Sequence, residues 1–147
     1  MEKQVFNISI NAPREKVWNI LWSKGSYEAW TAPFAEGSHA ETNWKKGSKV
    51  LFLDGKGSGM VSTVAENIPN EYMSFEHLGE VKNGVEDLDS PNVKQWAGAH
   101  ENYTLKTVNG KTELKIDMDV TDEFKEMFRT IWPKALDKIK ELSESNN

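Results

Sequence analysis

The sequence of 147 residues contains no cysteine, which excludes a disulfide scaffold, a thiolate metal site and a cysteine nucleophile. It has no long basic run, and 18 Lys and Arg against 23 Asp and Glu give a formal net charge of −5. Such a chain is poorly suited to binding nucleic acid or an anionic membrane surface. No apolar run approaches the roughly 18 residues of a membrane span, and the N-terminus lacks the apolar segment of a secretion signal. We therefore expect one cytoplasmic domain over residues 1–147, with no nucleic-acid partner and no membrane insertion.

Large aromatic side chains are what the sequence has in abundance. Six Trp, six Phe and three Tyr occur in a chain whose mean hydropathy is −0.65. A chain of this length buries roughly 68–70% of its extended surface, which is enough for a core without disulfides or metals. Aromatic rings fill cores more often than they contact ligands. In a fold with a partly filled core, the same rings can do both.

Alternating apolar residues predict strands, and apolar residues spaced by three and four predict helices. The predicted order is one strand, two short helices, five or six strands and one long helix, without β-α-β alternation. This order predicts an α+β fold in which an antiparallel sheet packs against the long helix. The segment 79–95 is long for a connection, so it is either a lid or an extension of its flanking strands. The predicted strands are 4–10, 49–54, 59–68, 72–78, 96–108 and 111–120, with a short one around 38–42, and the helices are 13–22, 23–30 and 121–143.

Turn residues mark the ends of several elements. Asn109 and Gly110 accept the positive φ angles of a type I′ hairpin turn, and Asp54 with Gly55 predicts a second tight turn. At the C-terminus, the polar residues 143–147 are expected to fray.

Several segments resemble those of one known family. The opening "INAPREKVWNILW" and "YEAW" are similar to its first strand and helix pair, "ENYTLKTVNGKTELKIDMDV" to its last hairpin, and "WPKALDKIKEL" to its C-terminal helix. The chain thus resembles the START-like domains of the SRPBCC superfamily, and within it the activator of Hsp90 ATPase (AHSA1-like) family. This resemblance implies a helix-grip fold, in which a curved antiparallel sheet of about six strands wraps around a long C-terminal helix and two short helices follow the first strand.

The resemblance also implies a cavity between the sheet and the long helix, which many members use to hold lipids, hormones, polyketides or other apolar molecules. The family has no shared catalytic motif, so the resemblance implies the place of a site rather than a reaction. Eukaryotic co-chaperones of the family carry an additional N-terminal chaperone-binding domain, for which 147 residues leave no room. We therefore expect a small molecule as the partner rather than an Hsp90-type chaperone.

The last predicted hairpin places a carboxylate among apolar side chains. A two-residue turn after Val108 sets the register of its two strands. Their apolar face is expected to lie toward the long helix. Glu101 lies on that face, where a carboxylate must be paired, hydrated or protonated. The predicted cross-strand pairs are Leu105 with Leu114, Tyr103 with Ile116, and Glu101 with Met118.

His77 is the second polar residue predicted on this face, because it alternates with Met73 and Phe75 in their strand. If that strand pairs with 96–108, His77 and Glu101 both point into the cavity, where they either orient a polar ligand group or act as an acid–base pair. The alternative is a hydrogen-bonded core histidine and a hydrated glutamate. The three histidines of the chain lack metal-ligand spacing, so we expect neither a metal nor a cofactor.

These observations predict a binding module for a small apolar or amphipathic molecule rather than an enzyme. His77, Glu101 and the Tyr103 hydroxyl would orient the polar part of the ligand. Two alternatives stay open: an Hsp90-associated or stress-related interaction protein, and a small cyclase, hydrolase or dehydratase that uses His77 and Glu101. The cavity wall is predicted to consist of Phe6, Ile8, Phe75, Tyr103, Ile116, Met118, Phe128 and Trp132.

Overall fold

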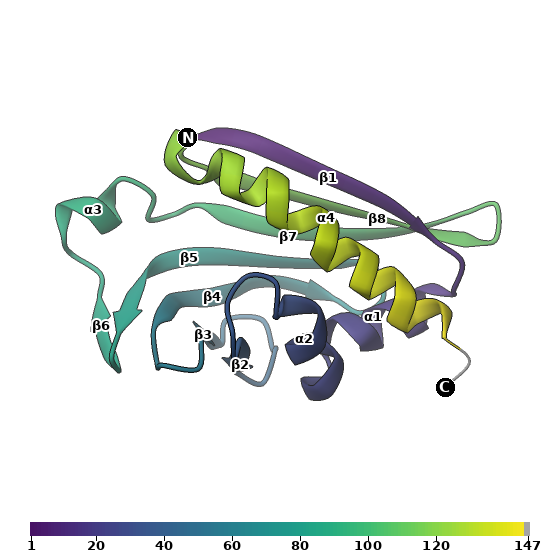
Figure 1. Cartoon of the computed structure of the whole chain (residues 1–147), viewed down its shortest axis with the longest axis horizontal. Coiled ribbons are helices and arrows are strands. Elements are labelled where there is room, and N and C mark those ends of the chain that lie inside the picture. The colour runs from purple at the N-terminus through teal and green to yellow at the C-terminus, as the bar shows by residue number, and fades with distance from the viewer. Residues whose placement is uncertain (146–147) are drawn as a thin grey trace.

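The computed structural model describes residues 1–145, which form eight strands and four helices (Figure 1). The strands are β1 (Glu2–Ile10), β2 (His39–Glu41), β3 (Lys49–Leu53), β4 (Gly59–Ile68), β5 (Tyr72–Lys82), β6 (Val85–Asp87), β7 (His100–Val108) and β8 (Lys111–Val120). The helices are α1 (Arg14–Trp22), α2 (Lys24–Thr31), α3 (Pro91–Lys94) and α4 (Asp122–Glu144).

All strands belong to one antiparallel sheet in the order β1-β8-β7-β5-β4-β3-β2, and β6 pairs with β5 beside this path. The sheet curves, and α4 lies across one of its faces in Figure 1, with α1 and α2 beside the C-terminal half of α4. This arrangement confirms the predicted α+β helix-grip architecture. The sheet has eight strands where about six are predicted. The three-residue strand β2 corresponds to the short strand expected around 38–42, and the three-residue strand β6 is the addition.

The hairpin of β7 and β8 has the predicted register. Asn109 and Gly110 have φ angles of 53° and 78°, so both adopt the left-handed conformation that a type I′ turn requires. Val108 pairs with Lys111, and the pairing continues unbroken to Glu101 opposite Met118. Local turn chemistry therefore determines where Glu101 lies in the sheet.

Helix α4 packs against the sheet mainly through its C-terminal half. Its buried residues all lie from Trp132 onward, whereas Phe124 and Met127 near its start are 36% and 43% exposed. The helix runs on through Ser143, which is fully buried, so it extends into the predicted tail. The end of that tail, 146–147, lies outside the described residues. Because the first turns of α4 do not enter the core, space is left beneath them.

Two β-bulges interrupt the pairing of β4 with β5. Val64 pairs with Phe75 while Glu66 pairs with Ser74, which leaves Ala65 without an opposing residue. Farther along, the pairing skips Leu78 in the same way. Each bulge shifts the inward and outward alternation by one residue. The faces that β4 and β5 present to the cavity therefore depend on both bulges.

The segment 79–95 extends the sheet at one end. It contains the last residues of β5, the short strand β6 and the helix α3, whose Val93 is fully buried. Ser90 caps α3 by accepting a hydrogen bond from the Val93 amide. Of the two alternatives for this segment, the structure therefore agrees with an extended strand. None of the helices in residues 1–145 combines the length and the apolar character that crossing a membrane requires.

Candidate functional site

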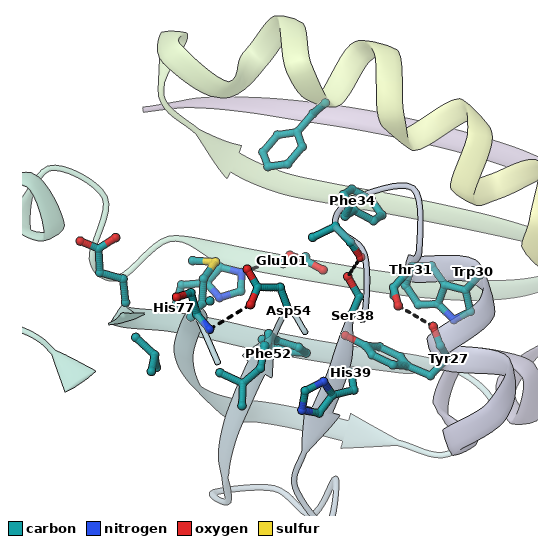
Figure 2. Close-up of a pocket in the computed structure, with 18 of the residues that line it drawn as sticks. Tyr27, Trp30, Thr31, Phe34, Ser38, His39, Phe52, Asp54, His77 and Glu101 are labelled. Carbon is teal, nitrogen blue, oxygen red and sulfur yellow. Dashed lines mark hydrogen bonds and ion pairs between the residues drawn. The ribbon is translucent and has the colours of Figure 1, made fainter. Parts of the chain in front are cut away.

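A cavity of about 650 Å³ lies between the sheet, helix α2, the loop that follows α2 and the first half of α4 (Figure 2). Known small-molecule sites have volumes of roughly 300–1,000 Å³, so this cavity is large enough for a drug-sized molecule. Most of its apolar wall is aromatic. The aromatic lining residues are Tyr27, Trp30, Phe34, Phe52, Tyr103, Phe128 and Trp132.

His77 and Glu101 form the polar centre of this cavity. His77 Nε2 lies 3.1 Å from Glu101 Oε1, and the Tyr103 hydroxyl donates a hydrogen bond to Glu101 Oε2. Strands β5 and β7 bring them together, since the His77 amide donates to the Ala99 carbonyl. Glu101 and Tyr103 are two residues apart on β7, so their side chains leave the same face of the sheet. The predicted juxtaposition of His77 with Glu101 is thus present.

Ser62 holds the other side of the His77 ring. Its hydroxyl oxygen lies 2.6 Å from His77 Nδ1, and Ser62 sits directly opposite His77 in the pairing of β4 with β5. Ser62 is fully buried and does not line the cavity, so it positions the imidazole from behind. A hydroxyl can donate or accept here, so it suits both the neutral and the protonated ring.

The sequence analysis missed Ser62 because of the bulge at Ala65. Counting back from the turn, Ile68 pairs with Tyr72, and the same register would put Leu78 opposite Ser62. The unpaired Ala65 moves the register by one residue and puts His77 there instead. No local turn or cap residue signals this shift.

The phenols near Glu101 are held in their neutral form. Burial, and secondarily the charge of Glu101, raises the pKa of Tyr27 above its usual range. Burial raises the pKa of Tyr103 as well, and the charge of Glu101 and the hydrogen bond to it act in the same direction. Both hydroxyls therefore stay protonated, and able to donate hydrogen bonds, at a higher pH than an exposed phenol would.

Charged residues gather toward the mouth of the cavity. Glu80 lines it together with His77, because the bulge at Leu78 turns both side chains to the same face. Lys82 Nζ lies 3.6 Å from Glu80 Oε1. Asp54 also lines the cavity and accepts hydrogen bonds from two backbone amides of its own turn. These residues make one end of the cavity polar and the opposite end aromatic.

The turn that carries Asp54 differs from the predicted tight turn. Five residues, 54–58, connect β3 to β4, and Gly57 rather than Gly55 has a positive φ of 79°. The Asp54 carboxylate accepts the amides of Lys56 and Ser58, which stabilises a wider loop than a two-residue turn. The pKa of Asp54 is lowered by these two N–H groups, that of Ser58 first.

The structure places half of the ten predicted site residues around the cavity. Those that line it are His77, Glu101, Tyr103, Phe128 and Trp132. The other five predicted wall residues do not line it: Phe75, Ile116 and Met118 belong to the buried core, and Phe6 and Ile8 are partly buried and pack against that core.

Aromatic rings pack against two of these five residues. Phe75 is fully buried and packs edge-on against Trp22, with ring centroids 5.5 Å apart. Phe6 stacks on Trp132 at 6.0 Å, so Trp132 separates β1 from the cavity. The wall is supplied instead by α2 and its following loop, through residues such as Trp30. Helical spacing predicts that these aromatic residues are buried, but it does not indicate whether they face the closed core or the cavity.

The other two histidines take no part in the cavity's polar centre. His39 lies at the margin, with Nε2 3.6 Å from the Glu41 carboxylate. The amide of His100 donates to Asp119, and its ring lies 3.4 Å from the Ser74 hydroxyl. Within residues 1–145, no group of three or more His, Asp or Glu side chains is arranged to hold a metal ion.

The family comparison agrees with this architecture. Residues 11–144 match the family described as "Activator of Hsp90 ATPase homolog 1-like protein". The chain belongs to this family. A search of the curated proteins finds no match.

Solved structures with the same fold cover essentially the whole chain. Protein MLL2253 from Mesorhizobium loti has a TM-score of 0.77 at 16% identity, over 99% of each chain. The Aha1 dimer from Colwellia psychrerythraea has a TM-score of 0.72 at 21% identity, over 100% of each chain. DynU16, from the dynemicin biosynthetic locus, has a TM-score of 0.74 at 15% identity, with 100% of this chain matching 49% of that one. At these identities the similarity establishes the fold, and the functional inference comes from the cavity itself.

Proposed function

We propose that this protein binds a small, largely aromatic or amphipathic molecule between its sheet and α4, and does so without transforming it. The observation that supports this function is the cavity of about 650 Å³, with aromatic walls and one hydrogen-bonded polar cluster. Ligand sites have this composition, because apolar contact supplies affinity and a few polar groups fix the orientation. The polar part of the ligand is placed beside Glu101 and His77.

Affinity in such a cavity comes mainly from apolar surface. Each Å² of ligand surface removed from water contributes about 25 cal/mol before the entropic costs of binding. Trp132 lines the cavity and supplies part of this apolar surface.

A titration of the whole protein tests this function. We expect saturable amide and indole NMR shifts near Glu101 and Trp132 with at least one member of a panel of fatty acids, sterols, flavonoids and small aromatic acids. Phe128→Ala removes an aromatic side chain from the lining of the cavity and should weaken binding by about fivefold or more, roughly 1 kcal/mol. Met127→Ala changes a neighbouring, solvent-exposed residue and should leave the affinity unchanged. Unshifted spectra across the panel would contradict a binding function.

An acid–base enzyme is the second candidate. It is supported by the hydrogen-bonded row Ser62–His77–Glu101, in which His77 holds the carboxylate of Glu101 and Glu101, which lines the cavity, can exchange a proton with a ligand. The test is to follow bound panel members by NMR in D₂O for conversion or hydrogen exchange. Turnover that His77→Gln and Glu101→Gln both abolish would favour this candidate, and unchanged ligand after prolonged incubation would leave binding as the function.

Association with an Hsp90-type chaperone is a third possibility, supported by family membership alone. A pull-down with the chaperone of the same organism and an assay of its ATPase rate test it. A rate that is unchanged at saturating protein would remove this candidate.

A further inference from the structure

The cavity has more acidic than basic side chains. Asp54, Glu80 and Glu101 line it, while Lys82 is the one lysine and no arginine lies among the described lining residues. The Lys82 side chain is 72% exposed and pairs with Glu80, so it offsets charge at the mouth rather than at the centre. Among the described residues, the ion-pair partner of Glu101 is His77. The central carboxylate therefore lacks a permanently charged counter-ion.

Glu101 also has unused hydrogen-bonding capacity. It accepts one bond at each oxygen, whereas a carboxylate offers about four acceptor positions. Its side chain is 22% exposed. A neutral His77 satisfies the observed contacts, because Nε2–H donates to Glu101 while Nδ1 accepts from the Ser62 hydroxyl. The carboxylate charge is then left without a balancing protein cation in a largely apolar site, and a bound cation would relieve this cost.

Aromatic rings surround the space beside this carboxylate. Tyr27, Phe52 and Glu101 border the same cavity in Figure 2, and the Phe52 ring lies 6.0 Å from the His77 ring. The charge of Glu101 contributes to the raised pKa of Tyr27, so the two side chains interact electrostatically. The faces of aromatic rings attract organic cations. The carboxylate and the aromatic rings of this cavity therefore both favour a positively charged ligand.

We infer that the ligand is an amphipathic organic cation, which carries a protonated amine on an aromatic or other apolar body. The amine lies against the Glu101 carboxylate, and the apolar body lies among Trp30, Phe34 and Trp132. This inference rests on the proposed binding function and specifies the chemical class of its ligand. Glu80 adds a second, weaker attraction at the mouth, since Lys82 already partly offsets its charge.

Three indole compounds that differ only near the end of the side chain test the sign of the ligand charge. Tryptamine carries an ammonium group, tryptophol a neutral hydroxyl and indole-3-propionate a carboxylate. We expect calorimetry and amide NMR to give tryptamine an affinity at least about tenfold higher than tryptophol, because a charge-assisted pair inside a cavity outweighs a neutral contact. Indole-3-propionate should bind more weakly than both.

Variants of the full-length protein test the residue. Glu101→Gln removes the charge and keeps the shape, and should weaken tryptamine binding about tenfold while changing tryptophol binding less than about twofold. Glu76→Gln is the matched control, because Glu76 lies on the neighbouring strand β5 and does not line the cavity. Glu80→Gln, at the mouth, should weaken tryptamine binding about twofold without touching the His77–Glu101–Tyr103 cluster.

The outcomes separate this inference from the proposed function. Equal or tighter binding of tryptophol or indole-3-propionate would overturn the cationic ligand and leave the binding function standing. The same holds if no indole compound binds but a sterol or fatty acid does. If no compound of either series binds, the proposed function fails with the inference. Glu101→Gln protein with a native-like spectrum and unchanged tryptamine affinity would overturn the role of Glu101.

Discussion

Ser62 and His77 face each other across β4 and β5, with the serine hydroxyl 2.6 Å from His77 Nδ1. This contact fixes the imidazole so that Nε2 points to Glu101, whose second oxygen accepts the Tyr103 hydroxyl. A buried residue that never meets the ligand thereby orients the polar centre of the cavity. The pair exists because Ala65 is bulged out of the register.

Removing the Ser62 hydroxyl should destabilise the protein. Ser62→Ala leaves His77 Nδ1 buried without a partner, which costs about 1–3 kcal/mol in the free energy of unfolding measured with urea. It should also move the ring nitrogen NMR shifts of His77. Ser9→Ala, at an exposed position of β1, is the control and should change stability by less than about 0.5 kcal/mol. Unchanged ring shifts in Ser62→Ala would show that the hydrogen bond is absent in solution.

The buried phenols should make the protein sensitive to alkali. The folded-state pKa of Tyr103 is raised, mainly by burial, so its contribution to stability is complete below the unfolded value of about 10. Above that pH the unfolded chain releases a proton that the folded chain retains, and stability falls by up to about 1.4 kcal/mol per pH unit for each such group. The loss ends only when the pH passes the folded-state pKa.

Tyr103→Phe isolates this contribution. The variant should lose less stability than the wild type between pH 9 and pH 11 in urea unfolding experiments, because it lacks one titrating phenol. Tyr27→Phe should act in the same direction, since burial and the charge of Glu101 raise the pKa of Tyr27 too. If wild type and both variants lose stability equally over this range, the two phenols are not held neutral by the fold.

The loop at the mouth of the cavity depends on close backbone contact. A Cβ at Gly37 would lie 2.6 Å from the Gly55 Cα, and Gly37 has a φ of +77°. Gly37→Ala should therefore lower the free energy of unfolding by about 1–3 kcal/mol. Gly25→Ala, in α2 with nothing within 4 Å of its Cβ, should instead raise it by about 0.4–1 kcal/mol. Equal effects of the two substitutions in thermal unfolding would contradict the contact between the two loops.

The turn at Asp54 should respond to acid. The amides of Ser58 and Lys56 lower the pKa of Asp54, so the carboxylate supports the turn above its unfolded-state pKa and loses this effect as the pH falls through the lower folded value. Asp54→Asn should flatten the dependence of stability on pH below about 4. Amide shifts of Lys56 and Ser58 that do not change as the pH is lowered to about 2 would contradict this account.

The strongest sequence predictions rested on local chemistry. Asn109 and Gly110 are residues that accept positive φ, so they determine the last hairpin, and the hairpin determines that Glu101 lies on the apolar face. The alternation that ends at His77 puts the histidine on the same face. Together with the order of elements, these patterns predict an α+β fold with an antiparallel sheet against the long helix, and they bring His77 to Glu101 if their two strands pair. The helix-grip architecture itself was implied by the resemblance to the family.

Tertiary structure decided what surrounds that pair. The bulges at Ala65 and Leu78 reverse strand parity where no turn residue marks them, and they bring Ser62 behind His77 and turn Glu80 toward the cavity. Non-local packing likewise places Phe75 in the core and Trp30 in the wall of the cavity, although the sequence pattern predicts both as large buried rings. Periodicity in the sequence determines which side chains become buried, whereas the space left between packed elements determines which of the buried side chains line a cavity.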